Sequence, residues 1–275
     1  MNSLLYFPKN WEKICTRLIN IVYLVFIPIN IDIQLGVQPI QNAAKWVRET
    51  PDSFKFIVKA YQGMTGHRRS ELPFETKIEM FQAFKDSLKP YEDANKLAMV
   101  LFQFPPWFDC RAENVNYLRY CKKLMDGVPV ALKFRNQSWF SEQYYEGTLA
   151  FMEQEGWIHA IADEPQAGDG SIPIVPIATN KGMTLIRMHG RNFHGWTKPK
   201  NAETNWREVR YLYKYNEAEL LEWKKRIEEL AKQSKDILVL FNNNSGGDAA
   251  GNAKEFQRLL DIEYDNLSAQ QLRLF

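Results

Sequence analysis

Seven short runs of apolar or β-branched residues recur along the chain, with amphipathic segments between them. These runs cover residues 29–33, 54–60, 98–104, 128–134, 157–162, 183–189 and 237–241. Runs that are apolar nearly throughout, such as 98–102, are typical of strands covered on both faces. Strands that alternate with helices predict βαβ units and a parallel sheet.

The clearest helical pattern covers residues 216–234. Asn216 can cap this helix, and Glu219, three residues further on, closes a capping box. One face of the helix then carries Leu220, Trp223, Ile227 and Leu230. By contrast, residues 163–182 contain several prolines and glycines, which indicates an active-site loop or an insertion rather than a domain boundary.

An apolar run near the start, residues 18–29, follows several basic residues and superficially resembles a signal peptide. The run contains Asn20 and Pro28, is shorter than the roughly 20 residues of a membrane-spanning helix, and lacks a small-residue cleavage site. We therefore predict a buried helix that runs into a buried strand, and no association with a membrane.

Seven predicted strands are one short of an eight-stranded barrel. A flavodoxin-like or Rossmann sheet is the alternative, but no glycine-rich turn follows an early strand, so nothing marks a dinucleotide site. The 275 residues also fit a single barrel, which commonly takes about 250. The pattern therefore favours an α/β fold of the TIM-type (β/α) barrel class, with parallel strands.

Composition narrows the class of protein. The 35 Lys and Arg residues nearly balance 33 Asp and Glu residues, and the net charge of +2 excludes a polybasic nucleic-acid coat and an acidic disordered tail. Hydrophobic residues make up 45% and charged residues 25%, which is the ordinary globular balance. The three cysteines are an odd number without a CxxC pair, so neither a disulfide framework nor a structural zinc site is expected. These features predict a cytoplasmic protein.

Polar residues gather where the predicted strands end, which is where barrel enzymes have their chemistry. The candidates for proton transfer are Lys59, Asp163 and His189. Imidazole titrates near neutral pH, which favours His189 as a general acid or base, although a lone histidine is more often structural. Gln103 and Arg135 are predicted to position a ligand.

The most informative local signal follows the last predicted strand. Three asparagines and a serine precede a Gly-Gly turn there, and a helix that begins near Asp248 would aim free backbone N–H groups at an anion. Barrels often hold a phosphate in this region, and arginines from the preceding strand and loop could donate to the same group. The alternative is a plain tight turn followed by a helix cap. The residues predicted to bind an anionic or phosphorylated ligand here are Arg187, Arg191, Asn242, Asn243, Gly246 and Gly247.

Two further features are less specific. Asp163 and Glu164 could join a histidine in a metal site, but no ligand spacing such as HExxH is present, so we predict no metal and name no cofactor. Aromatic residues at the predicted rim either stack on a base or sugar ring or seal the barrel mouth. They are Trp107, Phe108, Trp139, Phe140 and Trp196.

The last six residues, 270–275, read QQLRLF and resemble the short peptide by which bacterial replication and repair proteins dock on the sliding clamp. In such a complex Gln271 would make hydrogen bonds, and a hydrophobic groove would receive Leu272, Leu274 and Phe275. The alternative is a tail that folds back on the barrel.

Six segments together resemble the YecE-like family, also called domain of unknown function 72. They are residues 56–60, 101–106, 131–139, 162–166, 186–191 and 241–243. The resemblance runs from about Val37 to the C-terminus. It implies a TIM-type barrel and a bacterial, soluble protein, but it implies no reaction.

The sequence departs from the pattern of that family at two places. Lys133 stands where members usually have glutamate, which would replace a carboxylate acid or base by a cation. Members also open with a glycine-rich first strand, whereas residues 29–35 read INIDIQL here and family-like sequence resumes at Val37. We therefore expect the first strand to be missing or altered, through a shortened start and a local frame slip, which would leave an open barrel.

These observations divide the chain into an atypical N-terminal segment (1–36), a YecE-like barrel (37–265) and a C-terminal tail (266–275). The leading hypothesis is a protein that binds a phosphorylated or other anionic ligand at the C-terminal ends of its strands, with hydrolytic or phosphoryl-type chemistry. One alternative is a nucleic-acid processing accessory tethered to the sliding clamp. Another is an inactive, degraded copy of the family.

Overall fold

Strands and helices alternate along the described part of the chain. The computed structural model describes residues 22–24, 39–50, 52, 54–67, 72–196 and 209–262. The strands are β1 (Val22–Leu24), β2 (Phe56–Lys59), β3 (Leu97–Gln103), β4 (Val130–Lys133), β5 (Ile158–Asp163), β6 (Met183–Met188) and β7 (Asp236–Phe241). The α-helices are α1 (Ile40–Glu49), α2 (Lys77–Asp93), α3 (Ala112–Leu124), α4 (Tyr145–Gln154), α5 (Phe193–Trp196), α7 (Glu217–Leu230) and α8 (Asp248–Leu259). Short 3-10 turns follow three of the strands: η1 (Gln62–Thr65), η2 (Gln137–Phe140) and η3 (Gly168–Gly170).

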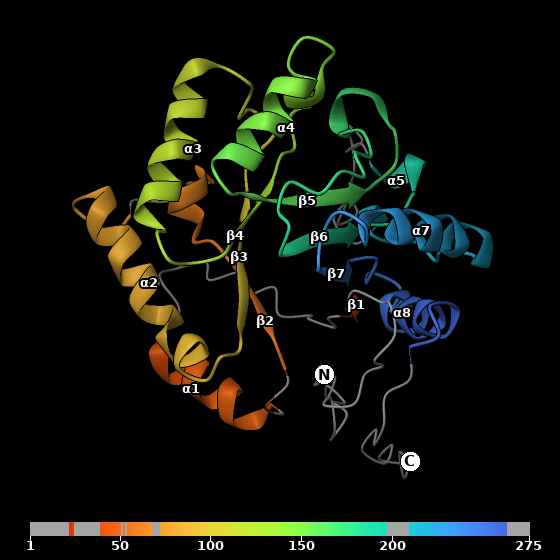
Figure 1. Cartoon of the computed structure of the whole chain (residues 1–275), viewed down its shortest axis with the longest axis horizontal. Helices are drawn as coiled ribbons and strands as arrows, with labels where there is room; N and C mark the ends of the chain where they lie inside the picture. The colour runs from red at the N-terminus through yellow and green to blue at the C-terminus, as the bar shows by residue number, and fades with distance from the viewer. Residues whose placement is uncertain are drawn as a thin grey trace.

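The described strands pair in parallel in a single sheet (Figure 1). Their order is β1-β7-β6-β5-β4-β3-β2, so the strands from β2 to β7 follow one another in space as they do in sequence. β1 and β2 lie at the two edges, and within the described ranges they do not pair with each other. The fold is therefore α/β with an open, all-parallel sheet, and closure into an eight-stranded barrel stays a prediction.

A hydrogen bond across the sheet shows how strongly it curls. Gln103, at the end of β3, accepts a hydrogen bond of 2.6 Å from Arg187 on β6. Neighbouring strands lie about 4.8 Å apart, so three steps along a flat sheet would separate these strands by roughly 14 Å. The direct contact requires that β3 and β6 face each other across a concave side. In Figure 1 the strand direction changes accordingly between β2–β4 and β5–β7.

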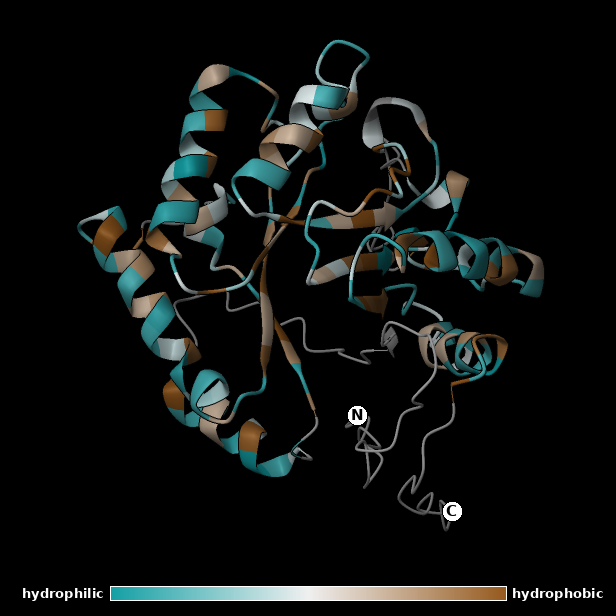
Figure 2. Cartoon of the chain, viewed as in Figure 1, coloured by the Kyte–Doolittle hydropathy of each residue, from teal (hydrophilic) through white to brown (hydrophobic). Residues whose placement is uncertain are grey.

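Helices cover the outer, convex face of the sheet, and the core divides into three apolar clusters (Figure 1). One cluster joins β2–β5 to α1–α4 through residues such as Phe102 and Trp157. A second joins β5–β7 to α7 and α8 through residues such as Trp223 and Phe256. The third consists of strand residues and fills the concave side. Figure 2 shows the resulting pattern, in which the helices carry both hydrophilic and hydrophobic residues while β5–β7 are mainly hydrophobic.

Most of the predicted elements are confirmed. Six of the seven predicted strands correspond to β2–β7, and the helix predicted over 216–234 is α7, with both hydrogen bonds of its capping box present. The strand predicted at 29–33 lies outside the described residues. The helix predicted over 18–29 is wrong at Val22–Leu24, which forms a strand because the edge of β7 offers unpaired backbone groups to it.

The connection from β5 to β6 contains the short turn η3 and no α-helix. Thr179 in this connection hydrogen-bonds to the backbone of Trp157 and His159, so the segment packs along β5. His159 is buried there, and burial lowers the pKa of its imidazole to about 4. No helix in the described ranges is long and apolar enough to cross a lipid bilayer.

Candidate functional site

A layer of polar side chains lies at the C-terminal ends of the strands. Alternate residues of a strand point to the same side of a sheet. The apolar cluster on the concave side includes Ile57, Leu101, Ala131, Leu185 and Leu240, from β2, β3, β4, β6 and β7. Two residues further along, these strands carry Lys59, Gln103, Lys133, Arg187 and Asn242. The polar residues therefore share the concave side, above an apolar floor.

Arg187 links three strands in this layer although it is only 6% exposed. Its guanidinium donates from Nη1 to Oε1 of Gln103 at 2.6 Å and from Nη2 to Oδ1 of Asn242 at 3.0 Å. Its Nε has no hydrogen-bond partner among the described residues. Burial lowers the pKa of Arg187 to about 10. Arg187 is thus a buried cation held by two neutral amides.

Lys133 contacts two other ionisable side chains of the layer and is only 3% exposed. Its Nζ donates to Oε2 of Glu164 at 3.3 Å and lies 2.6 Å from Nε2 of His189. The second oxygen of Glu164 accepts a hydrogen bond of 2.9 Å from the backbone N–H of Ile172. Both oxygens of this carboxylate are therefore engaged.

The contact with Lys133 sets the tautomer of His189 whenever the lysine is protonated. An ammonium group has only donors, so Nε2 then accepts and the proton of the neutral imidazole resides on Nδ1. Burial, followed by the charges of Lys133, Arg187, Arg210 and Arg135, holds the pKa of His189 well below its ordinary value, so the ring is neutral at pH 7. In the described part of the chain Nδ1 has no partner. His189 Nδ1–H and Arg187 Nε–H are therefore two buried, unused donors on one side of the sheet.

Cations outnumber carboxylates around this layer. Burial lowers the pKa of Lys133 to about 7; Glu164 opposes that shift, while Arg187 and Arg135 add to it. Arg210, itself 6% exposed, also faces Arg135 and Glu164. Within the described ranges, Glu164 is the one carboxylate that acts on the pKa values of Lys133, Arg187 and Arg210. The layer thus has an excess of positive charge.

Aromatic side chains that follow β6 lie against the layer. The guanidinium of Arg210 lies 3.7 Å from the ring centroid of Trp196, whose Nε1 donates to the carbonyl of Gly170 at 2.8 Å. The ring of His189 lies 5.7 Å from that of Tyr211 and 6.4 Å from that of Trp196. A cation–π contact stabilises Arg210 without neutralising its charge.

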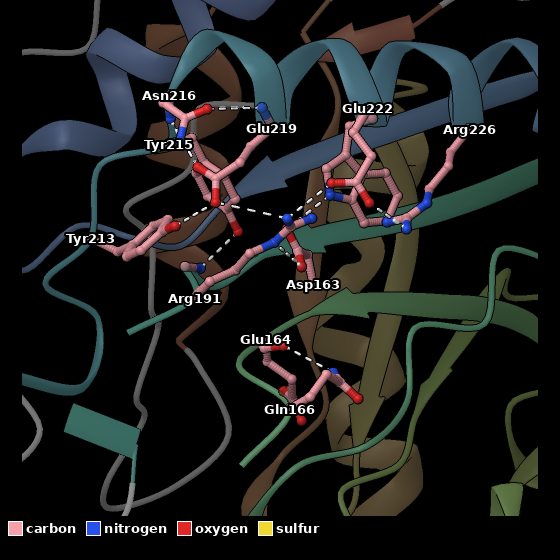
Figure 3. Close-up of polar contacts among 12 residues, drawn as sticks. Asp163, Glu164, Gln166, Arg191, Tyr213, Tyr215, Asn216, Glu219, Glu222 and Arg226 are labelled. Atoms are coloured by element: carbon pink, nitrogen blue, oxygen red, sulfur yellow. Dashed lines mark hydrogen bonds and ion pairs between the residues drawn. The ribbon is translucent and has the colours of Figure 1, made fainter. Parts of the chain in front are cut away.

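Asp163 and Arg191 form a separate ionic cluster that faces helix α7 (Figure 3). Asp163 is fully buried and accepts hydrogen bonds from Arg191 Nε at 3.0 Å and from Trp223 Nε1 at 2.8 Å. Arg191 also donates to Glu222 at 2.9 Å and lies 3.7 Å from Glu219. Burial raises the pKa of Asp163. These two residues tie α7 to the sheet, and the proton transfer and ligand binding expected of them stay predictions.

Asn243, unlike its neighbour Asn242, faces α8 rather than the polar layer. Asn243 is fully buried and donates to a backbone carbonyl and, at 2.9 Å, to Oδ1 of Asn252 on α8. Gly247 has a φ of +82° and directly precedes α8. A Cβ placed on Gly246 would lie 2.9 Å from a carboxylate oxygen of Asp248. A negative charge therefore already stands at the positive end of this helix, and anion binding by the glycine turn stays a prediction.

The predicted rim aromatics mostly pack within the protein. Trp139 stacks on Phe134 with centroids 4.0 Å apart and donates to the carbonyl of Phe108 at 2.8 Å. Phe140 is 8% exposed and Trp107 is 69% exposed. Most of these aromatic residues therefore pack against the loops at this rim, as the second alternative predicted, rather than standing free to stack on a ligand.

The other predicted residues divide between the layer and the undescribed tail. Lys59 and Arg135 are half-buried, at the end of β2 and shortly after β4. The clamp-binding residues Gln271, Leu272, Leu274 and Phe275 lie outside the described residues. Within the described ranges, no three His, Cys, Asp or Glu side chains are grouped so that they could hold a metal ion.

Three residues of the layer were not predicted as site residues: Lys133, Glu164 and Arg210. Lys133 lies two residues beyond an inward-facing strand residue, as Lys59 and Gln103 do. The alternation of side chains along a strand could therefore have predicted it. Arg210 follows β6 by more than twenty residues, and no local pattern marks it.

Comparisons with known proteins agree with the fold. The chain is 63% identical over 240 residues to UPF0759 protein YunF of Bacillus subtilis. The matched region covers 87% of this chain and 85% of that protein. Its structure is similar to the crystal structure of a DUF72 family protein from Enterococcus faecalis, with a TM-score of 0.81, 36% identity, and coverage of 86% of this chain and 85% of that chain. A DUF72 family protein from Thermotoga maritima gives a TM-score of 0.68 and 30% identity, over 88% of this chain and 85% of that chain. The family model described as "Protein of unknown function DUF72" matches residues 36–273. The chain therefore belongs to the DUF72 family, which confirms the resemblance noted in the sequence.

Proposed function

We propose that this protein binds a small anionic ligand, through a phosphate or carboxylate group, in the polar layer at the C-terminal ends of β3, β4, β6 and β7. The main support is Arg187, a 6% exposed guanidinium with two neutral amide partners and an unused Nε donor. Removing an ion from water without a counter-charge costs several kcal/mol. Glu164 acts on Arg187 through its charge, but no described carboxylate forms an ion pair with the guanidinium, and an anionic ligand would supply that direct partner.

The surrounding charges support the same proposal. Lys133, Arg210 and Arg135 add to the positive potential around His189, and Arg135 also acts on Arg187. Glu164 opposes them, but Lys133 and the backbone N–H of Ile172 already engage its oxygens. A low-dielectric surrounding strengthens the attraction between this excess of cations and an incoming anion.

The two unused donors favour a group with several acceptor oxygens. Arg187 Nε–H and His189 Nδ1–H belong to residues two apart at the end of β6. Both side chains therefore face the concave side of the sheet. Phosphate and carboxylate groups accept several such hydrogen bonds at once, and hydrogen bonds to charged acceptors are the stronger ones. A phosphorylated ligand, as expected from the sequence, therefore fits the donors, and hydrolytic or phosphoryl-type chemistry stays a prediction.

Titration of the purified protein with small anions tests the proposal. Inorganic phosphate, sugar phosphates and short carboxylates are added singly, and thermal unfolding and binding heat are recorded. A ligand present at 100 times its dissociation constant stabilises the folded state by about 2.7 kcal/mol. We expect at least one of these anions to raise the melting temperature of the wild type, and Arg187→Met to lose that response.

A matched variant separates site binding from general charge effects. Arg119 is half-exposed on α3 and pairs with Glu155, which precedes β5 and so lies at the opposite end of the sheet. Arg119→Gln removes the same unit of charge and should keep the full response. The proposal is wrong if no anion shifts the wild type, or if Arg187→Met responds as the wild type does.

A further inference from the structure

Lys96 and Lys133 are equally buried, at 3% exposure, but are held in different ways. Nζ of Lys96 donates to the carbonyl oxygens of Val47 and Thr50 at 2.8 and 2.9 Å and lies 3.4 Å from the hydroxyl of Thr50. The carboxylate of the exposed Asp52 lies 4.0 Å away, beyond hydrogen-bond distance. The carbonyl and hydroxyl acceptors cannot exchange a proton with an ammonium group, so Lys96 is a structural donor. Lys133 instead contacts an imidazole and a carboxylate, and both can take up a proton.

The amine of Lys133 also lies next to the unused donors of the anion site. His189 contacts Lys133 through Nε2 at 2.6 Å and presents Nδ1–H on the other side of the same ring. Arg187 acts on both Lys133 and His189 through its charge. An anion bound to Arg187 and His189 would therefore bring the atoms next to it close to the amine of Lys133.

We propose that Lys133 is a nucleophile that forms an imine with an aldehyde or ketone group of the anionic ligand. This inference rests on the proposed function, because the anion site positions the carbonyl group. Buried lysines beside other cations are the ones that serve as Schiff-base nucleophiles, since both surroundings favour the neutral amine.

The ionisation of Lys133 agrees with this role. Burial lowers the pKa of Lys133 to about 7, although Glu164 opposes the shift, and Arg187 and Arg135 lower it further. About half of the Lys133 side chains are then uncharged at neutral pH, whereas an exposed lysine with a pKa near 10.4 is almost entirely protonated. His189, held neutral, accepts the Lys133 N–H and orients the amine.

The proposed step balances without a further reactant. The lone pair of Nζ attacks the carbonyl carbon, a C–N bond forms, and the π electrons of the carbonyl group move to its oxygen. Glu164 accepts a proton from the nitrogen and returns it to the oxygen, which gives a neutral carbinolamine. The C–O bond then breaks as the nitrogen lone pair forms C=N, and with one proton from solvent the oxygen leaves as water. The positive iminium ion is left paired with the Glu164 carboxylate.

Reductive trapping tests the proposal on the full-length chain. Dihydroxyacetone phosphate and dihydroxyacetone serve as the two probes, sodium borohydride reduces any imine to a stable amine, and mass spectrometry of peptides locates the adduct. We expect the phosphorylated probe to label Lys133 at least about tenfold faster at pH 7 than exposed lysines, because its neutral fraction is far larger. Lys96 should stay unlabelled, which makes it an internal control for burial.

The Lys133→Arg variant and the response of the wild type to anions decide the outcome. Lys133→Arg removes the primary amine and should abolish labelling at this position, and phosphate binding is judged on the wild type. The mapped peptide of the wild type gives the same information if that variant does not fold. If phosphate binds but Lys133 is not labelled, or is labelled no faster than exposed lysines, the imine proposal is wrong and the anion site stands. If no anion of the panel stabilises the wild type and the probe does not label Lys133, both proposals are wrong.

Discussion

Replacing Arg187 by methionine should change the stability of the unliganded protein little, whereas the same replacement at Arg191 should destabilise it strongly. Both arginines lie at the end of β6 or just after it, and both make at least two side-chain hydrogen bonds. They differ in the charge of their partners. Arg187 donates to two neutral amides, and Arg191 donates to the carboxylates of Asp163 and Glu222.

The expected magnitudes follow from those partners. Arg187→Met loses two hydrogen bonds from a charged donor, at about 1.5 to 3 kcal/mol each, and removes a burial penalty of several kcal/mol. The lost hydrogen bonds and the relieved burial penalty are of similar size. Gln103 and Asn242 are half-buried, so water can donate to their amide oxygens in place of Arg187. We expect a net change within about 2 kcal/mol of zero in either direction. Arg191→Met leaves the fully buried Asp163 without its counter-ion, which costs about 3 to 5 kcal/mol.

Urea unfolding in phosphate-free buffer measures the difference. Tryptophan fluorescence and circular dichroism should give coincident transitions, which justifies a two-state free energy. In thermal melts each kcal/mol corresponds to about 2 °C for a chain of this size, so Arg191→Met should melt roughly 6 to 10 °C lower. An equal loss of stability at the two positions would refute the reasoning. Arg187 would then stabilise the unliganded protein as strongly as Arg191 does, and its burial would not point to a missing anion.

Three further predictions use other groups of the site. The folded-state pKa of Lys133 is lowered to about 7 by burial, so the unfolded chain binds more protons than the folded one above pH 7. Stability should therefore rise by up to about 1.4 kcal/mol per pH unit between pH 7 and 10 in the wild type relative to Lys133→Met, as measured by urea unfolding at several pH values. Gly190 has a φ of +88° and an added Cβ would lie 2.5 Å from Cβ of Tyr213, so Gly190→Ala should destabilise by more than about 3 kcal/mol. Gly127→Ala, at a φ of +81° with nothing within 4 Å, should cost only about 1 to 2 kcal/mol in the same assay. Gln103→Glu places a carboxylate on the buried guanidinium and should stabilise the unliganded protein by about 1 kcal/mol while weakening phosphate binding at least about tenfold in calorimetry.

The sequence predicted most of the fold because buried parallel strands leave a strong signal. Runs such as 98–104 are apolar on both faces, since helices cover the convex side and other strands line the concave side. Residues 216–234 show both a capping box and an apolar stripe, so the start of α7 was predicted to within one residue, while its end at Leu230 comes four residues earlier than predicted. Val22–Leu24 differs because its pairing with β7 is a long-range contact that no local pattern reveals.

The candidate site was only partly predictable because neighbouring residues of a strand face opposite sides. Asp163 and Glu164 are adjacent in sequence, yet the first faces Arg191 and Trp223 and the second faces Lys133. Counting by two from Ala160, which belongs to the concave cluster, places Glu164 on the concave side and Asp163 on the other. Alternation along the strand thus separates the two carboxylates, and the structure shows which of them faces the polar layer.

The partners of Arg187 explain how a fold can position a cation and still keep its charge for a ligand. A carboxylate at the place of Gln103 or Asn242 would orient the guanidinium equally well but would neutralise it. An amide oxygen accepts the same hydrogen bond without adding a charge. The cation–π contact of Arg210 with Trp196 has the same property. Where carboxylates do meet an arginine, at Asp163 and Glu222 around Arg191, the contact joins a helix to the sheet instead. The choice between amide and carboxylate partners thus divides the arginines of β6 and its following loop into one available to an anion and one committed to structure.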